Sequence, residues 1–183
     1  MKLRLLLLFA AAVAAFTTAA RAQSITPAIQ AKIDAKTSDI VAWAADPVIV
    51  GAVRAQNAAL PADYAAMTQE KWAALTVLDP FVRAFSKNAA GAFLKAKKDE
   101  LVTLPFLSDA AGYKVAFTAK TTNWCHKGMP KHEVPLTGKT WQGPIEVNQA
   151  SGQQQVQIAV PVLDGGKPIG SLVVGLSITK LSQ

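Results

Sequence analysis

The chain has few groups that could form a disulfide or attach a cofactor. Cys125 is the only cysteine among 183 residues, so no intramolecular disulfide can form and the C-x-x-C-H pattern of haem attachment is excluded. The sequence also lacks a phosphate-binding glycine-rich loop, a dinucleotide fingerprint and an H-E-x-x-H metal motif. The folded domain must therefore depend on its apolar core.

Concentrated charge is also missing. Nineteen basic residues against twelve acidic ones give a formal net charge of +7. The excess is spread along the chain, and only Lys95, Lys97 and Lys98 are clustered. A nucleic-acid-binding protein normally shows a denser basic stripe. We therefore expect an ordinary solvated surface and no nucleic-acid partner.

The N-terminus has the layout of a secretory signal peptide. Lys2 and Arg4 precede an apolar run over residues 5–16, and Ala20-Arg21-Ala22 follows as a small-x-small cleavage site. The alternative is an uncleaved anchor, but the run is shorter than the roughly 20 apolar residues that a spanning helix needs. We predict cleavage of residues 1–22 and a periplasmic or secreted protein with no stable membrane anchor.

Residues 23–183 are enough for one domain with a substantial core and too few to expect two. The most apolar late stretch, residues 169–178, is too short to cross a bilayer as a helix. We therefore expect a single soluble domain that would need a membrane-bound partner to report across a membrane.

The first part of this domain has the signals of helices. Ser24 is the expected N-cap of the first one. Asp46-Pro47 and Asp79-Pro80 each predict a stop followed by a new helix, with aspartate as N-cap and proline at the first helical position. Thr68 is another expected N-cap. This part should therefore fold as a series of helices.

The second part changes to the alternating period of strands. Five strands are expected over residues 104–107, 113–118, 145–147, 155–162 and 171–178, in meander order. One apolar set should face the helices: Val156, Ile158, Val160, Leu172, Val174 and Leu176. The sequence thus predicts an α+β domain with a five-stranded antiparallel sheet.

Several segments resemble extracytoplasmic Cache sensor domains. FLSDAAGYKVA at 106–116 resembles their first hairpin, VQIAVPVLDGGKPIGSLVVGL at 156–176 their closing hairpin, and DPVIVGAV at 46–53 their helical part. The resemblance covers most of residues 30–181. It implies a PAS-like fold with a long N-terminal helix, further helices and a sheet whose concave side holds a small ligand. The chain is most similar to free-standing secreted members, which would act with a membrane receptor, kinase or transporter.

Residues 121–141 are the part of the chain densest in reactive side chains. Where many relatives carry a run like Thr-Ser-Asp-Tyr-Trp-Gln-Gly-Asp-Glu, this chain has TTNWCHKG at 121–128, without the acids. An amide, an imidazole and an ammonium in their place favour a small anionic or amphiphilic ligand such as a carboxylate. The expected ligand contacts are Thr121, Asn123, Trp124, His126, Lys127 and Trp141. The alternative is a surface loop that its tryptophans anchor to the sheet.

Two other functions remain open at this point. Cys125, His126, Met129 and His132 lie within eight residues, and such ligands suit copper or zinc, so the chain could be a periplasmic metal-handling protein. A hydrolase with Cys125 as nucleophile would need an oriented base and an oxyanion site, and no motif around Cys125 supports one. We predict a ligand-binding domain that is not an enzyme and has no cofactor.

Overall fold

The computed structural model describes residues 25–148 and 152–183. The predicted signal peptide lies outside the described residues. Within them, no helix combines the length and the apolar character that a membrane span requires.

A series of helices precedes the sheet, as predicted. They are α1 (Pro27–Ala44), α2 (Pro47–Ala58), α3 (Ala62–Ala66), α4 (Gln69–Ala74), α5 (Pro80–Lys87) and α6 (Ala89–Ala96). The N-caps at Asp46, Thr68 and Asp79 are confirmed, because each side chain accepts a hydrogen bond from a backbone N–H two or three residues on. The prediction of Ser24 as first N-cap is wrong, since α1 begins at Pro27 and Thr26 caps it.

The second part contains the expected five strands and two further helices. They are β1 (Phe106–Asp109), β2 (Lys114–Phe117), α7 (Pro130–Leu136), β3 (Trp141–Val147), β4 (Gln154–Asp164), β5 (Lys167–Ser177) and α8 (Ile178–Leu181). The strands form one antiparallel sheet in the order β2-β1-β5-β4-β3. The α+β class is therefore confirmed, but the meander order is wrong. β1 pairs with β5, and the chain between β2 and β3, which contains α7, crosses to the far edge of the sheet.

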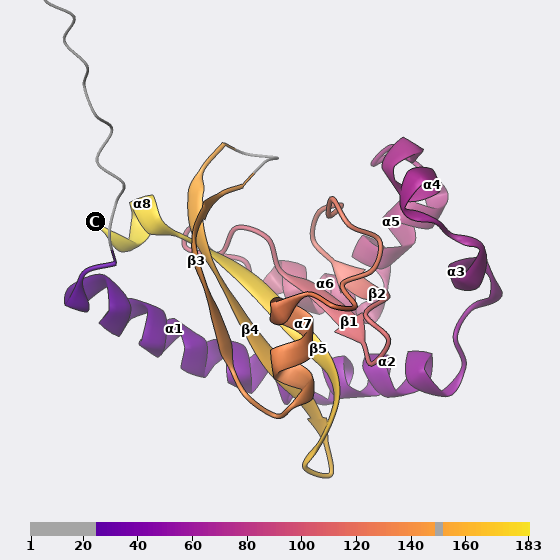
Figure 1. Cartoon of the computed structure of the whole chain (residues 1–183), viewed down its shortest axis with the longest axis horizontal. Coiled ribbons are helices and arrows are strands. Elements are labelled where there is room, and N and C mark those ends of the chain that lie inside the picture. Colours follow the sequence, from indigo (N-terminus) through magenta and orange to yellow (C-terminus); the bar gives the residue numbers. More distant parts are fainter. Residues whose placement is uncertain (1–24, 149–151) are drawn as a thin grey trace, which may run out of the picture.

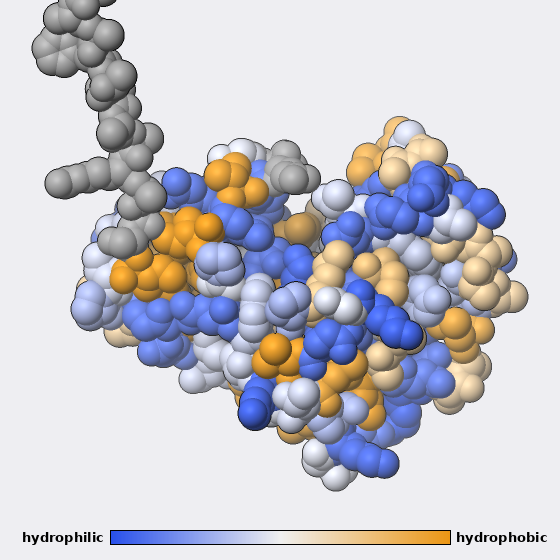
Figure 2. Space-filling view, viewed as in Figure 1, coloured by the Kyte–Doolittle hydropathy of each residue, from blue (hydrophilic) through white to orange (hydrophobic). Residues whose placement is uncertain are grey.

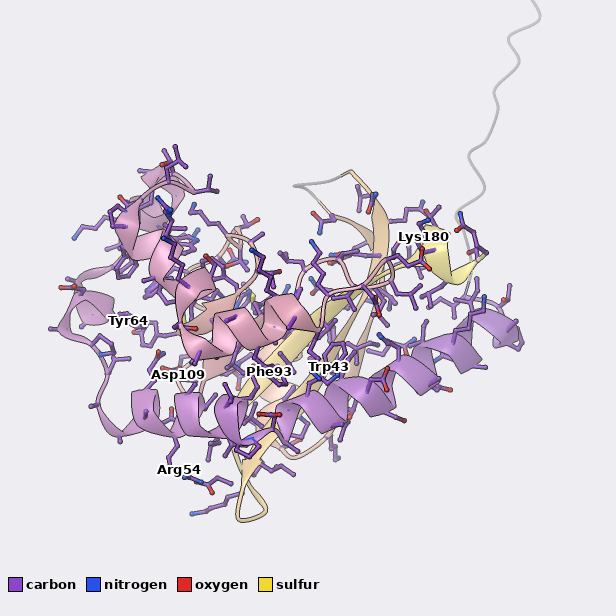
Figure 3. All side chains as sticks on the ribbon, turned by 180° about the vertical axis from the view of Figure 1, so that it is seen from behind. Trp43, Arg54, Tyr64, Phe93, Asp109 and Lys180 are labelled. Atoms are coloured by element: carbon purple, nitrogen blue, oxygen red, sulfur yellow. The ribbon has the colours of Figure 1, made fainter. Side chains whose placement is uncertain are left out.

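One face of the sheet packs against α1, α2 and α6, and we call it the α1 face. All six predicted core residues are at most 1% exposed there, namely Val156, Ile158, Val160, Leu172, Val174 and Leu176. Trp43 of α1 and Phe93 of α6 point into the same core (Figure 3). Each fully buried Val, Leu or Ile side chain contributes about 1.5–3 kcal/mol to folding. This face supplies the apolar core on which the domain depends.

The opposite face, which we call the α7 face, is covered as well. Figure 1 shows α7 in front of the strands, and it packs on β3, β4 and β5. Beside it lies an aromatic cluster that α3, α4 and α5 contribute to, made of Tyr64, Trp72, Phe81, Phe85, Phe106, Phe117 and Trp124. Polar side chains are buried on this face too, among them Gln155, Gln157 and Ser171. The α7 face is therefore the place to look for a site.

Candidate functional site

A β-bulge turns one lysine onto the α7 face. The pairing of β1 with β2 shifts register between Leu107 and Ser108, so that Lys114 lies opposite Ser108. Such an extra residue re-aims the side chains that follow it. Lys114 is 0% exposed, and its ammonium nitrogen lies 4.8 Å from the centre of the Phe106 ring. A lysine that alternation alone would give to a hairpin surface is thus fully buried.

The loop after β2 is held against the β1–β2 turn. The Trp72 indole N–H donates to the Thr121 carbonyl over 2.8 Å, and the His126 amide donates to the Gly112 carbonyl over 2.9 Å. Gly112 has a φ of +89°, and a Cβ there would lie 2.5 Å from the Lys127 nitrogen. Only glycine fits this turn and this approach. These contacts fix the position of His126.

Helix α7 brings a second lysine to the same place. His132 Nδ1 and Ser171 Oγ of β5 are 2.8 Å apart, which pins α7 to the sheet. One residue earlier, Lys131 donates to Gln157 Oε1 over 3.0 Å. The Lys131 ammonium nitrogen lies 5.9 Å from the centre of the Phe106 ring. α7 lies inside what the sequence suggested was a loop, so its helical geometry decides where Lys131 points.

Three nitrogen-bearing side chains therefore surround Phe106. The His126 ring stacks on it, with 4.6 Å between ring centres and 17° between planes, and His126 Nδ1 contacts Lys114 Nζ. Within residues 25–148 and 152–183, no carboxylate lies within 4.0 Å of the ammonium of Lys114 or Lys131. Cation–π contacts offset part of the cost of burying such groups, but the positive charge has no anionic partner.

Burial controls the protonation of Lys114. Desolvation lowers the pKa of Lys114 well below its usual 10.5, because the charged form loses water that the protein does not replace. The positive charge of Lys131 lowers this pKa further, whereas Cys125 and Asp109 act in the opposite direction. The ammonium form of Lys114 is therefore disfavoured in the empty site.

Burial also lowers the pKa values of His126 and Lys131. Burial, followed by the positive charges of Lys114, Lys131 and His132, lowers the pKa of His126 to about 2. Burial lowers the pKa of Lys131 as well, and Glu146 partly offsets this. His126 is thus a neutral imidazole at physiological pH, and burial disfavours the charged form of all three side chains.

A pocket of about 390 Å³ opens beside this group. Its lining comes from the loop after β2, from α7, and from β1, β3 and β4: Leu104, Phe106, Lys120, Thr121, Thr122, Asn123, His126, Lys131, Glu146, Val147, Asn148, Gln155 and Gln157. Figure 2 shows a hollow between two raised parts of the surface in this region. The pocket is large enough for a small organic molecule and mixed in polarity.

The residues predicted from the sequence divide into two groups. Thr121, Asn123 and His126 line the pocket. The other three do not. Trp124 is 3% exposed and packs in the aromatic cluster, 5.0 Å from Tyr64 between ring centres. Lys127 is exposed, and Trp141 is half-buried over Gly143, where a Cβ would lie 2.6 Å from the indole ring. Both tryptophans therefore anchor the structure around the pocket.

Sequence reasoning missed Lys114, Lys131, Glu146 and Gln157. Lys114 and Gln157 sit at polar positions of alternating strands, which look like solvent-facing sites until the other face of the sheet is known to be covered. The only sequence signal near Lys131 is the Met129-Pro130 pair, with proline at the first helical position of α7. That signal could have predicted the helix but not its packing.

The proposed metal ligands do not converge. His126 contacts Lys114 through Nδ1, His132 contacts Ser171, and Met129 Sδ accepts from the Asn123 amide over 3.8 Å. Across the described part of the chain, no three His, Cys, Asp or Glu side chains are placed to share a metal ion.

Comparison with known proteins gives distant structural matches. No protein-family model and no curated protein sequence matches the chain. The ligand-binding domain of the Pseudomonas aeruginosa amino acid chemoreceptor PctC, in complex with GABA, is 14% identical, with a TM-score of 0.46 over 84% of this chain and 57% of that one. The ligand-binding domain of the Pseudomonas fluorescens chemoreceptor CtaA, in complex with L-serine, is 16% identical, with a TM-score of 0.45 over 84% and 54%.

A third match is the sensor domain of the V. cholerae histidine kinase DctB, 16% identical with a TM-score of 0.39 over 84% of this chain and 59% of that one. This chain thus spans less than two thirds of the length of each of the three proteins. All three of these proteins are ligand-binding or sensor domains.

Proposed function

We propose that this protein is an exported, sensor-type binding domain that takes a small organic carboxylate into the pocket beside Phe106. One observation carries the proposal: Lys131 and His126 border a 390 Å³ pocket, and no carboxylate of the described chain lies within 4.0 Å of the Lys131 ammonium. A partly buried cationic group without a counter-ion is unfavourable, and a bound anion would reduce that cost.

The pocket offers donors for the carboxylate on one side and an acceptor on the other. Lys131, the His126 ring and the Asn123 amide can donate to carboxylate oxygens. A hydrogen bond to a charged group contributes about 1.5–3 kcal/mol. Glu146 accepts from Gln155 over 2.9 Å and gives the far side of the pocket a negative charge. A ligand with a second, positively charged end would fit this arrangement.

A panel of four-carbon carboxylates tests the proposal. Butyrate, succinate and 4-aminobutyrate differ in the charge of the far end, and each would be added to the protein of residues 23–183 in thermal-shift and calorimetric titrations. We expect at least one to raise the melting temperature. Lys131→Met should weaken binding about tenfold to a hundredfold, the equivalent of about 1.4–2.8 kcal/mol. If none of the three binds, the proposed function is wrong.

Lys127→Met is the matched control, because Lys127 is exposed four residues away and does not line the pocket. Its affinity should stay within about twofold of the parent. A loss equal to that of Lys131→Met would mean that the ligand lies on the loop surface and not in the pocket.

Export and a membrane-bound partner are part of the proposal. The n-, h- and c-region layout of residues 1–22 supports export with a cleaved signal. Intact mass of the protein recovered from the periplasmic fraction should correspond to residues 23–183. Recovery of the full-length chain in the membrane pellet would instead support an uncleaved anchor.

A further inference from the structure

We propose that Lys114 is a positioning residue that couples anion binding in the pocket to the uptake of one proton, acting through His126. The inference rests on the proposed function, because it names how that same site responds to its ligand. Lys114 itself does not line the pocket, whereas His126 does. The hydrogen-bonded link between the buried lysine and the pocket is therefore the imidazole of His126.

Protonation of Lys114 would fix the tautomer of the His126 ring. The ammonium form has donors and no acceptor, so in the anion-bound state His126 Nδ1 would accept from Lys114 Nζ. The ring proton of the neutral imidazole then lies on Nε2. No group of the described chain is a hydrogen-bond partner of Nε2, and His126 borders the pocket. His126 thus offers the pocket an N–H donor.

A bound carboxylate would complete a chain of hydrogen bonds. Its oxygen accepts from His126 Nε2–H, and His126 Nδ1 accepts from Lys114. Successive hydrogen bonds polarise one another, and a charged donor strengthens the bond it makes. The anion therefore favours the ammonium form of Lys114, and that ammonium strengthens the donor that His126 presents to the anion.

The charges around Lys114 do not hold it in the ammonium form in the empty site. Asp109 of β1 favours that form, but its carboxylate already accepts from Gln56 over 2.8 Å and from the Tyr113 amide over 2.9 Å. Three other titratable groups act on Lys114 or His126, namely Cys125 of the loop and Lys131 and His132 of α7. Two carboxylates act on the α7 side chains: Glu146 of β3 on Lys131, and Glu133 on His132. A ligand carboxylate would be the first anion to reach the His126–Lys114 pair.

The proton balance is simple. The unprotonated Lys114 amine gains one proton from the buffer as the anion binds, and no covalent bond to the ligand forms. Linkage then requires affinity to fall with rising pH, by at most about tenfold per pH unit, once Lys114 is unprotonated in the empty protein. At lower pH, where the empty protein already carries this proton, the affinity should stop changing.

Calorimetry with butyrate, succinate and 4-aminobutyrate measures the coupling. Titrations at one pH in two buffers of different ionisation enthalpy give the number of protons taken up, and a series from pH 6 to 9 gives the pH profile. We expect net uptake of up to one proton in the parent protein. Lys114→Met, which keeps the length and removes the charge, should abolish the uptake and flatten the profile while the circular dichroism spectrum is retained.

Lys131→Met is the matched variant, because Lys131 also lies in the pocket with a lowered pKa. It should bind more weakly but still take up the proton. Uptake that persists in Lys114→Met and disappears in Lys131→Met would overturn the role of Lys114. The proton can also be located directly, since the NMR shift of the Lys114 side-chain nitrogen changes when the amine is protonated.

The two proposals fail in different ways. Binding of any of the three carboxylates without buffer-dependent heat would contradict the coupling and leave the binding function intact. No binding of any of them would contradict the proposed function and the coupling with it.

Discussion

The two faces of the sheet bury their side chains by different rules. On the α1 face the buried residues are aliphatic, and packing against α1, α2 and α6 satisfies them without directional bonds. On the α7 face the buried set includes Lys114, His126, His132 and Gln157, each in contact with a specific polar partner or aromatic ring. Burial is similar on both faces, but its chemical content is not.

This difference separates the part that stabilises the domain from the part that can bind. Apolar burial is favourable in proportion to area, whereas buried charge costs free energy unless it is paired. A face that retains two lysines without carboxylate partners gives up stability that aliphatic residues would supply. This cost supports the proposal that the pocket takes an anion.

The largest expected effect on stability comes from comparing two variants, each of which places one aspartate on a different face of the sheet. Ile158→Asp puts a carboxylate into the α1 face, where Ile158 is 1% exposed, and should abolish folding. The cost of several kcal/mol compares with a total stability of about 5–15 kcal/mol. Gln157→Asp, next along the strand, puts its carboxylate where Gln157 now accepts from Lys131. That variant should fold but lose carboxylate binding, as circular dichroism and calorimetry would show.

Equal tolerance of aspartate at positions 157 and 158 would contradict the division between the faces. A Gln157→Asp variant that folds and binds butyrate, succinate or 4-aminobutyrate as the parent does would contradict the placement of the anion beside Lys131.

The next largest effect concerns the aromatic part of the α7 face. Trp124 contacts Trp72 at 5.2 Å and Tyr64 at 5.0 Å between ring centres, so Trp124→Ala should cost about 3–5 kcal/mol. Chemical denaturation would measure this loss. Trp141→Ala is the control, because Trp141 is only half-buried, and its cost should be clearly smaller. The reverse order would mean that the loop is anchored mainly through β3.

The pH dependence of stability should report the buried imidazole. The pKa of His126 is about 2 in the folded protein, mainly through burial, against 6.5 when exposed. Between these values the unfolded chain binds the extra proton, so stability is lost as the pH falls below about 6.5. The contribution of His126 is at most about 1.4 kcal/mol per pH unit.

His126→Gln removes the titrating group and keeps a polar side chain. Denaturant unfolding between pH 4 and 7 should show a shallower slope in this variant. An unchanged slope would mean that His126 is not responsible for the acid sensitivity.

The smallest effect is expected at the only cysteine. Cys125 Sγ donates to the Ala111 carbonyl over 3.5 Å and accepts from the Lys127 amide over 3.4 Å. A serine hydroxyl can make both contacts. Cys125→Ser should therefore change the melting temperature by no more than a few degrees, in line with a cost of about 0.5 kcal/mol or less. A large loss, or loss of a bound metal ion, would revive the metal-handling alternative.

Several features of the fold could be predicted from the sequence because they are local. An aspartate before a proline caps the helix that follows it, because its side chain accepts a hydrogen bond from the backbone N–H two residues on, as at Asp46 and Asp79. The alternation of β4 and β5 likewise places every second side chain on one face whatever the neighbouring strands are. These signals defined the helical half, the five strands and the α1 face.

The α7 face depends on contacts between distant segments, which no local pattern contains. The pairing of β1 with β5 sets the strand order, and the bulge at Leu107 and Ser108 turns Lys114 inward. The packing of α7 on the sheet then decides that Lys131 enters the pocket while Lys127 stays outside. The sequence alone determines which side chains lie near one another along the chain. Only tertiary packing decides which of them are buried and brought into contact, because burial depends on segments that are distant in the sequence.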